Sequence, residues 1–441
     1  MIEGIDYFSA EIAEAIKGKM CGTNVKIEAL TTNSKEKSTD PFCFFAIKGK
    51  NFNGADFIEE AIQNGSKLII TQEHIECSVT VIYVENVVKA LGLLAKKHKG
   101  NTKIIAITGS NGKTTTKDMI VSVLKTSYSV CGTSKNLNNE IGVALTLLSI
   151  KNEDFCVVEM GMRGLGEIEW LSFIAEPNIG IITNCMSAHI GVLGNKKNIF
   201  KAKTEILKYI KEYAILPNER RFKRVESNRA KKCFVNYKSV KKIKRNEGSI
   251  SFDINDCKNI EIDSIYEHDI KNAMLAYKLG KLLSIDDETI KRGLKNFTKQ
   301  QNRGELFKNN NLLIVNDCYN ASYESVKMAI ISIKEHFKNK KIAVLLGDML
   351  ELGEKAEKLH FKIGKLCKKL KIDKFFVYGN YAKYYLKGFR GGKELTAFCT
   401  IKENVFAELK ESYVLLIKAS NSMNFEKIID RMREKNDKFK N

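Results

Sequence analysis

The sequence predicts an α/β protein of three domains, and two features of the chain support this prediction. Short apolar runs alternate with amphipathic helical stretches along most of the 441 residues, a pattern typical of parallel sheets covered by helices on both faces. One apolar run, 104–107, leads into a glycine-containing turn and a helix that opens with Lys113-Thr114, as phosphate-binding loops do. We therefore expect a central phosphate-loop ATPase domain with a mostly parallel sheet, and a C-terminal Rossmann-like domain.

The first domain is expected at residues 1–99, before a short linker at 99–102. Its predicted strands are 42–47, 67–71 and 79–84, and its predicted helices are 55–64 and 87–98. The alternation of the two kinds of segment indicates strand–helix–strand units. We expect this domain to be a separate α/β unit.

The second domain is expected at 100–303 and the third at 304–441. In the second, strands are predicted at 154–160 and 178–184, and an amphipathic helix at 198–212 places Ile199, Ala202, Ile206 and Ile210 on one face. In the third, strands are predicted at 312–317, 341–348, 374–379 and 413–418. We expect the first two of these to be neighbours, so that the loops after them meet at the carboxyl edge of the sheet, where ligands bind.

Composition limits the class of protein. No run of 18 apolar residues occurs, so no membrane span is expected, and the 11 cysteines are scattered singly, which fits a reducing compartment. The net charge is +21, and the densest basic stretch, 219–245, lacks a nucleic-acid motif. This stretch has three possible roles: a solvated surface, attraction of anionic substrates, or nucleic-acid binding. We favour the solvated surface. We expect a cytoplasmic monomer that does not bind nucleic acid.

The turn after the 104–107 strand has the residues of a phosphate cradle. Gly109 and Gly112 let the backbone approach phosphate oxygens, and the helix N-terminus directs free N–H groups at them. Lys113 supplies a positive charge, and the Thr114 hydroxyl can bind Mg²⁺. The strict spacing would place glycine where this chain has Ile107, so a tight turn before an ordinary helix is the alternative. The predicted nucleotide-binding residues of the loop are Gly109, Ser110, Asn111, Gly112, Lys113, Thr114 and Thr115.

Three side chains of the second domain suggest a metal site. Glu159 follows a strand directly, where a carboxylate can hold Mg²⁺ or remain solvated. His189 lies in the loop after the next strand and is either structural or a ligand. Lys203 lies beside the apolar face of its helix, so it is either a surface lysine or a partly buried amine with a lowered pKa. A neutral amine can take up CO₂ and become a carbamate, which binds metal as a carboxylate does.

Further polar residues gather at predicted strand ends near and within the third domain. They are Arg303, Asp317, Asn320, Asp348, Glu351, His360 and Lys418. Each is weak evidence alone, because strand-end carboxylates are often solvated or cap helices. Their common position at the edge where parallel sheets bind ligands makes them candidates together.

Eight segments occur in the order found in the Mur ligases, and the chain resembles that family over nearly its whole length. They are TGSNGKTTTKDM, NLNNEIGVALTLL, EMGMRGLGEIEWL, ITNCMSAHIGVLG, AKTEI, NDCYNASYESV, GDMLELGEKAEKLH and LLIKAS. The segment GDMLELG with a following histidine is specific for the branch that uses D-alanyl-D-alanine. The Asp-Asn-Pro-Arg motif of the diaminopimelate-adding branch is absent from the sequence.

The resemblance implies an ATP-dependent ligase of peptidoglycan precursor synthesis. In that reaction the γ-phosphate activates a carboxylate of UDP-N-acetylmuramoyl-tripeptide, and D-alanyl-D-alanine attacks the acyl phosphate. The implied cofactors are ATP and two Mg²⁺ ions. By the family pattern Thr114 and Glu159 bind one ion, whereas His189 and a carbamylated Lys203 help to hold the second; Lys113, His189 and Lys203 are then the catalytic residues.

The resemblance also assigns ligand contacts. Asn272, Arg303 and Asp317 match residues at ATP. The substrate-binding positions implied are Ser34, Asn136, Asn138, Asn139, Asn320, Asp348, Glu351, His360 and Lys418. The chain departs from the family at Asn33-Ser34-Lys35, Ala419 and Asn421, which affects the UDP contacts and the last loop rather than the reaction.

Two other classes of protein stay open at this point. One is another acid–amine ligase of the same build, such as a folylpolyglutamate synthetase. The other is a non-catalytic nucleotide-binding module, which salt-dependent DNA binding without acceptor-stimulated ADP release would favour.

Overall fold

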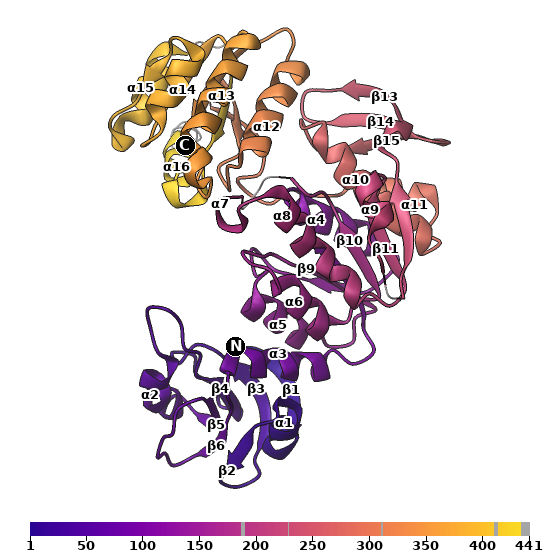
Figure 1. The fold of residues 1–441 in the computed structure, drawn as a ribbon, viewed down its shortest axis with the longest axis vertical. Helices are drawn as coiled ribbons and strands as arrows, with labels where there is room; N and C mark the ends of the chain where they lie inside the picture. The colour runs from indigo at the N-terminus through magenta and orange to yellow at the C-terminus, as the bar shows by residue number, and fades with distance from the viewer. Residues whose placement is uncertain (187–189, 228, 310–311, 410–412, 434–441) are drawn as a thin grey trace, which may run out of the picture.

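The computed structural model describes residues 1–186, 190–227, 229–309, 312–409 and 413–433. It has three α/β units that follow one another along the chain, each built on its own six-stranded sheet (Figure 1). The predicted fold class is therefore confirmed. No helix among the described residues is long and apolar enough to cross a bilayer.

The N-terminal unit has the strand order β1-β3-β4-β5-β6-β2. Its central strands pair in parallel, whereas β1 and β2 pair antiparallel at the two edges. The predicted helix at 87–98 matches α3, and the predicted helix at 55–64 divides into a 3₁₀ turn and α2. The elements are β1 Ile2–Phe8, α1 Ser9–Ile16, β2 Lys19–Cys21, β3 Lys26–Thr31, β4 Phe42–Phe45, η1 Gly54–Phe57, α2 Ile58–Gln63, β5 Ser66–Thr71, β6 Thr80–Tyr83 and α3 Val87–His98.

The central unit has a wholly parallel sheet of order β12-β11-β10-β7-β9-β8. Apolar clusters cover both faces of this sheet, so its strands read as nearly continuous hydrophobic runs. The elements of the sheet and its helices are β7 Lys103–Thr108, α4 Lys113–Leu124, β8 Val130–Gly132, α5 Glu140–Leu148, β9 Phe155–Glu159, α6 Glu167–Ala175, β10 Ile179–Ile182, α7 Ile190–Leu193, α8 Lys196–Thr204, η2 Glu205–Lys208, β11 Tyr213–Pro217, α9 Arg220–Arg224 and β12 Lys231–Val235.

The helix predicted at 198–212 is shorter in the structure. It ends at Thr204 and continues as the 3₁₀ turn η2, although the four predicted apolar residues are all buried. The N–H groups of Lys211 and Glu212 donate to the carbonyls of Pro177 and Asn178. These contacts to the two residues just before β10 take the place of continued helical hydrogen bonds, so the prediction was wrong for the last turns.

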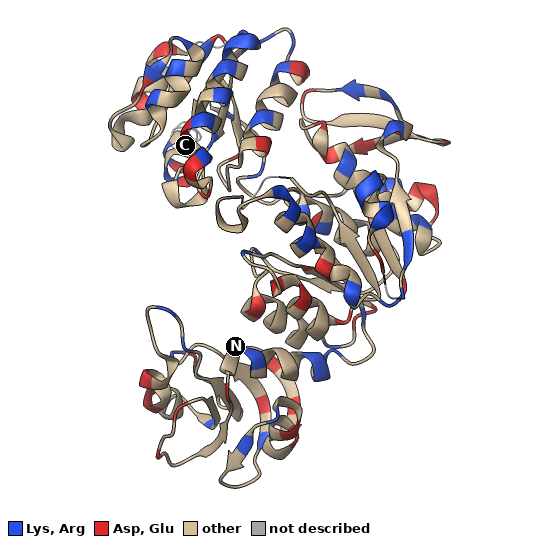
Figure 2. Cartoon of the chain, in the orientation of Figure 1, with Lys and Arg blue, Asp and Glu red and all other residues tan. Residues whose placement is uncertain are grey.

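The basic stretch 219–245 contributes two edge strands. β12 is the outer strand of the central sheet, and β13 is the outer strand of a small antiparallel sheet ordered β13-β14-β15. Lysines on edge strands oppose pairing with other chains, which fits the solvated reading of this stretch, and Lys and Arg occur in every unit (Figure 2). The remaining elements here are η3 Tyr237–Ser239, β13 Val240–Arg245, β14 Ile250–Ile254, β15 Cys257–Ile262, α10 His268–Leu282 and α11 Asp287–Lys295.

The C-terminal unit has the order β16-β17-β21-β18-β19-β20, parallel except for β16. The predicted strands at 312–317 and 341–348 are β17 and β18, and β21 lies between them, so the expectation that they are neighbours was wrong. Its elements are β16 Glu305–Asn309, β17 Leu312–Asn316, α12 Tyr323–His336, β18 Lys341–Leu346, η4 Gly353–Lys355, α13 Ala356–Lys369, β19 Lys374–Val377, α14 Ala382–Phe389, β20 Lys393–Glu394, η5 Phe398–Thr400, α15 Ile401–Glu408, β21 Tyr413–Lys418, η6 Asn421–Met423 and α16 Glu426–Arg433.

The N-terminal and central units share an apolar core. α3 packs against α5 and α6, and one continuous hydrophobic cluster runs from Ile5 to Ala230. At the rim of this joint Glu176 accepts ion pairs from Lys96 and Lys99, at 3.0 and 3.2 Å. The two units are thus joined by a packed interface as well as by the linker.

Candidate active site

A cleft of about 1160 Å³ lies where the three units face one another. The phosphate loop, the ends of β9 and β10, the start of α10 and the loops of the C-terminal unit line it, and the segment Lys48–Lys50 reaches it from the N-terminal unit. Ser322 of the C-terminal unit donates a 3.3 Å hydrogen bond to Oδ1 of Asn111 in the loop. The cleft therefore brings together predicted residues from distant parts of the sequence.

The phosphate loop has the backbone that its glycines predict. Gly109 and Gly112 have φ of 152° and 78°, and Gly112 precedes the first turn of α4. The loop is anchored from β10, because Thr183 and Asn184 donate to the carbonyl of Asn111 at 2.7 and 2.9 Å. Lys113 folds back and donates to the Gly109 carbonyl at 3.1 Å. These bonds preorganise the concave turn and the free helix N-terminus above it.

Thr114 and Glu159 form an oxygen-rich point beside this turn. The Thr114 hydroxyl donates to Oε2 of Glu159 at 2.7 Å, and the side-chain amide of Asn138 donates to Oε1 at 2.7 Å. Glu159 is buried at the end of β9, with its backbone N–H held by Thr133. A hydroxyl and a carboxylate side by side at a phosphate loop fit the oxygen ligands of Mg²⁺.

Lys203 is buried in the wall of the site, with 1% of the residue exposed. Burial, followed by the positive charge of Lys113, lowers the pKa of Lys203 to about 7. Burial likewise lowers the pKa of Lys113. The predicted amine with a lowered pKa is therefore present, whereas His189 lies outside the described residues. Among the described residues, no group of three His, Cys, Asp or Glu side chains forms a metal cluster.

Asn272 closes the side of the loop next to α10. Its Oδ1 accepts from Thr116 at 3.2 Å, and its amide donates to Asp269 at 3.0 Å. A Cβ at Gly112 would lie 2.5 Å from this Oδ1, so only glycine fits there. Lys299 pairs with Asp269 at 2.7 Å. Burial raises the pKa of the Asp269 carboxyl, but the nearby charge of Lys299 helps to outweigh this effect and lowers that pKa to about 2.

The join of the central and C-terminal units holds Arg303, Asp317 and Lys418. The Arg303 guanidinium lies 3.6 Å from the ring centre of Tyr319, and its buried Nε has no hydrogen-bond partner among the residues that the structure describes. Lys418 donates to Asp317 at 2.7 Å and to the carbonyl of Asn320 at 2.9 Å. All four of Arg303, Asp317, Asn320 and Lys418 line the cleft. The sequence did not predict that Tyr319 lines the cleft. Its position next to Asn320 was the only feature of the sequence that could have indicated this.

The predicted acceptor residues separate in space. Glu351 lines the cleft, but Asp348 and His360 are buried behind its wall. Asp348 accepts the N–H groups of Asn380 and Tyr381 at 2.8 and 3.1 Å. His360 accepts the N–H of Met349 at 3.0 Å. In this structure these two side chains hold the loops around them.

The predicted muramoyl and UDP contacts also differ in position. Asn136, Asn138 and Asn139 line the cleft, and Asn139 additionally caps α5 by accepting from Gly142 at 2.9 Å. Ser34 is buried in the N-terminal unit, where its hydroxyl donates to Glu60 at 2.5 Å. Ser34 does not line the described cleft.

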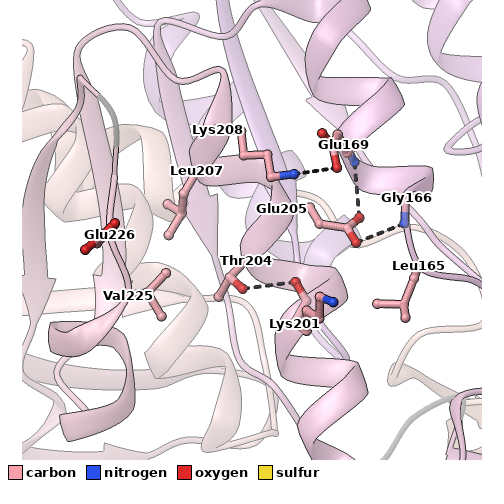
Figure 3. A pocket seen from close by; sticks show the side chains of 10 residues that line it. All are labelled: Leu165, Gly166, Glu169, Lys201, Thr204, Glu205, Leu207, Lys208, Val225 and Glu226. Atoms are coloured by element: carbon pink, nitrogen blue, oxygen red, sulfur yellow. Dashed lines mark hydrogen bonds and ion pairs between the residues drawn. The ribbon is translucent and has the colours of Figure 1, made fainter.

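A second, smaller hollow of about 640 Å³ lies beside α8 and η2 (Figure 3). Its central side chain is Glu205, whose two oxygens accept the N–H groups of Gly166 at 2.9 Å and Glu169 at 3.3 Å. Lys208 pairs with Glu169 at 2.6 Å on the same side. Because Lys203 and Glu205 are two residues apart, this hollow marks where the lysine-bearing segment is fastened to α6.

The chain matches two protein-family models. Residues 107–280 match the Mur ligase middle domain, and residues 302–421 match the Mur ligase glutamate ligase domain. The first match ends at residue 280 and the second begins at residue 302.

Individual relatives match nearly the full length. The UDP-N-acetylmuramoyl-tripeptide–D-alanyl-D-alanine ligase of Bacillus subtilis (strain 168) is 33% identical, over 96% of this chain and 97% of that protein. The crystal structure of MurF from Acinetobacter baumannii superposes with a TM-score of 0.91 at 25% identity, over 98% of this chain and 100% of the other. MurF ligase from Thermotoga maritima, solved in complex with ADP, gives a TM-score of 0.84 at 28% identity, over 93% and 98%.

Proposed function

The chain belongs to the Mur ligase family, and from that premise we propose that it joins D-alanyl-D-alanine to UDP-N-acetylmuramoyl-tripeptide at the expense of ATP. The observation that carries this proposal is the 33% identity over 96% of the chain to a ligase with that name. The cleft supports it, since the phosphate loop shares it with candidate residues of the C-terminal unit and with the segment Lys48–Lys50 of the N-terminal unit. The reaction belongs to peptidoglycan precursor synthesis, and we place it in the cytoplasm, with the protein acting as a monomer.

The proposed chemistry has two steps. A carboxylate oxygen of the tripeptide attacks the γ-phosphorus of ATP, and the bond to the ADP oxygen breaks. The amine of D-alanyl-D-alanine then attacks the carbonyl carbon of the acyl phosphate, loses a proton and expels inorganic phosphate. A free carboxylate is a poor electrophile, so phosphorylation supplies the leaving group that amide formation needs.

We assign roles in the first step, the transfer of the γ-phosphate, to residues of the central unit and its join to the C-terminal unit. The N–H groups at the start of α4 and the Lys113 ammonium hold the phosphates and offset their negative charge. Thr114 and Glu159 would hold Mg²⁺, which when bound would offset more of the negative charge of the phosphates. Asn138 fixes the orientation of the Glu159 carboxylate through its 2.7 Å hydrogen bond. Asn272 and Arg303 are proposed to contact the nucleotide.

We extend the proposal to a carbamate on Lys203. A pKa of about 7 leaves a large fraction of this amine neutral near physiological pH, and only the neutral amine attacks CO₂. The new C–N bond forms as the amine loses a proton, and the product is an anionic carboxylate-like group. We propose that this group would help to hold a second Mg²⁺, together with His189. Lys203→Arg keeps a cation but forms no stable carbamate, so we expect it to lose as much activity as Lys203→Ala.

The third unit is proposed to bind D-alanyl-D-alanine. Asn320, Glu351 and Lys418 line the cleft there, opposite the phosphate loop that activates the other substrate. A carboxylate such as Glu351 can orient the attacking amine, and cationic or N–H groups can hold the distal carboxylate. A single D-alanine lacks that distal anchor and should react poorly.

The test is release of ADP in the presence of UDP-N-acetylmuramoyl-tripeptide, measured with and without D-alanyl-D-alanine. We expect strong stimulation by the dipeptide and a product that contains both substrates. Stimulation by glutamate with a folate substrate would favour a folylpolyglutamate synthetase instead. Absence of acceptor-stimulated ADP release, combined with salt-dependent DNA binding, would favour a nucleotide-binding module.

A further inference from the structure

Two cysteines of the central sheet face each other across neighbouring strands. Cys131 lies in the middle of β8, Cys156 lies in β9, and the two are direct register partners in this parallel pair. Neighbouring strands lie about 4.8 Å apart, which is within the separation of about 4.4–6.8 Å that a disulfide spans between Cα atoms. Both side chains contact the same apolar cluster and so lie on one face of the sheet.

The two thiols differ in acidity and in access to solvent. The Cys131 thiol donates a 3.9 Å hydrogen bond to the carbonyl of Phe155. The neighbouring Cys156 side chain lowers the pKa of the Cys131 thiol, whereas Cys131 and burial raise the pKa of Cys156 well above its ordinary value. Cys156 is buried, whereas Cys131 is half-buried on β8, the edge strand of the sheet. An oxidant therefore reaches Cys131 first, and Cys131 is the better nucleophile of the pair.

We propose that Cys131 and Cys156 form a reversible redox pair that a hydroperoxide converts into an intramolecular disulfide. The Cys131 thiolate attacks one oxygen of hydrogen peroxide, the O–O bond breaks, and Cys131 becomes a sulfenic acid as one water leaves. The Cys156 thiol then attacks the Cys131 sulfur and displaces a second water. Overall two thiols lose two electrons and two protons, and one peroxide is reduced to two waters.

The pair is connected to the proposed site through Thr133. This residue follows β8 directly, accepts the backbone N–H of Glu159 at 2.9 Å through its hydroxyl, and accepts Nζ of Lys117 at 2.9 Å through its carbonyl. A disulfide fixes the two Cβ atoms about 3.8 Å apart, a covalent constraint that the reduced strand pair lacks. We therefore expect oxidation to change the fit of β8 against β9, three residues before Glu159.

The test treats the full chain with hydrogen peroxide, blocks free thiols by alkylation, and maps cysteine pairs by mass spectrometry. We expect one peptide pair, joined at 131 and 156 and lighter by two hydrogen atoms, that a dithiol separates again. Cys131→Ser should abolish this pair, and the matched variant Cys399→Ser, which changes an exposed cysteine, should retain it. Cys156→Ala, which should leave Cys131 as a sulfenic acid or an external mixed disulfide, serves if the serine variant does not fold.

Recovery of wild-type Cys131 in an over-oxidised form, with Cys156 still free to be alkylated, would overturn the proposal. The rate of ADP release should fall by roughly ten- to hundred-fold on oxidation, which is the order of loss that a displacement of about 1 Å causes in an active site. The rate should recover when a dithiol reduces the bond. The reduced protein tests the proposed ligase reaction separately. Unchanged turnover of the cross-linked protein would overturn the connection through Thr133.

Discussion

The Thr114 hydroxyl donates a 2.7 Å hydrogen bond to Oε2 of Glu159, joining the first turn of α4 to the end of β9. The two residues are 45 positions apart in the chain. Their contact puts a hydroxyl and a carboxylate beside the phosphate loop, and Asn138 holds the other carboxylate oxygen. These are the hydroxyl and carboxylate oxygens that we propose as ligands of Mg²⁺.

Glu159→Gln should weaken the binding of Mg²⁺, so that the enzyme needs a higher Mg²⁺ concentration for the same rate. The amide keeps the size of the side chain but loses the negative charge that attracts the cation. We expect the Mg²⁺ concentration at half-maximal ADP release to rise by about 10- to 100-fold, the range seen when partners of a metal site are lost. The control is Glu153→Gln, just before the start of β9. An unchanged Mg²⁺ titration would refute the assignment of Glu159.

Lys113→Ala should reduce the rate of ADP release by about 10²–10³-fold. This is the typical loss when one preorganised group that stabilises charge developing in the transition state is removed. The ammonium already lies at the turn, bonded to the Gly109 carbonyl. Lys125→Ala, at the end of the same helix and exposed, is the matched control. Circular dichroism of both variants checks the fold, and near-normal turnover of Lys113→Ala would rule out its phosphate role.

Lys203 should make the free energy of unfolding depend on pH. Its pKa is about 7 in the folded chain, against an ordinary 10.5. Between these values the unfolded chain holds a proton that the folded chain has lost, so this lysine makes the protein more stable as pH rises from about 7 to 10.5, by at most about 1.4 kcal/mol per pH unit. Below about pH 7 Lys203 is protonated in both the folded and the unfolded chain, so the full cost of burying the charged amine lowers the stability.

The measurement is urea denaturation of wild type and Lys203→Met in CO₂-free buffer without nucleotide, at about pH 6.5, 8 and 9.5. The variant should gain relative stability at the lowest pH and lose that advantage as pH rises. A stability difference that stays constant over this range would mean that the amine titrates normally.

Glu205→Ala should impair turnover although the side chain faces the second hollow rather than the active-site cleft (Figure 3). It leaves the N–H groups of Gly166 and Glu169 without their acceptor, and α8 can then shift relative to α6. We expect kcat to fall with little change in the KM for ATP, and Glu205→Gln to recover part of the loss. Equal rates for the alanine and glutamine variants would remove the positioning role.

Asp348 and Glu351 should respond differently to amide substitution. Asp348→Asn replaces an oxygen that accepts a backbone N–H, so we expect a loss of about 1–3 kcal/mol in stability. Glu351→Gln changes a residue that lines the cleft, so we expect a higher KM for D-alanyl-D-alanine and little change for ATP. Denaturation midpoints and the two KM values separate these effects. A selective change in dipeptide KM for Asp348→Asn alone would reverse the assignment.

The sequence by itself determined the features that are written in contiguous residues. A strand, two glycines with positive φ, and a helix that begins at Lys113 follow one another within 104–124, so local backbone preferences fix the phosphate loop. The alternation of strands and helices likewise predicted parallel sheets. The apolar face of α8 placed Lys203 near the core because helical spacing relates side chains four residues apart.

Only the tertiary structure decided which distant segments meet. β21 lies between β17 and β18, and this order brings Lys418 to Asp317 across 101 residues. Asp348 looked like a ligand in the sequence, but its oxygens accept N–H groups of a turn more than 30 residues away. Such contacts depend on how whole sheets order their strands and bury their faces, because a buried polar atom takes whichever partner the packing brings to it.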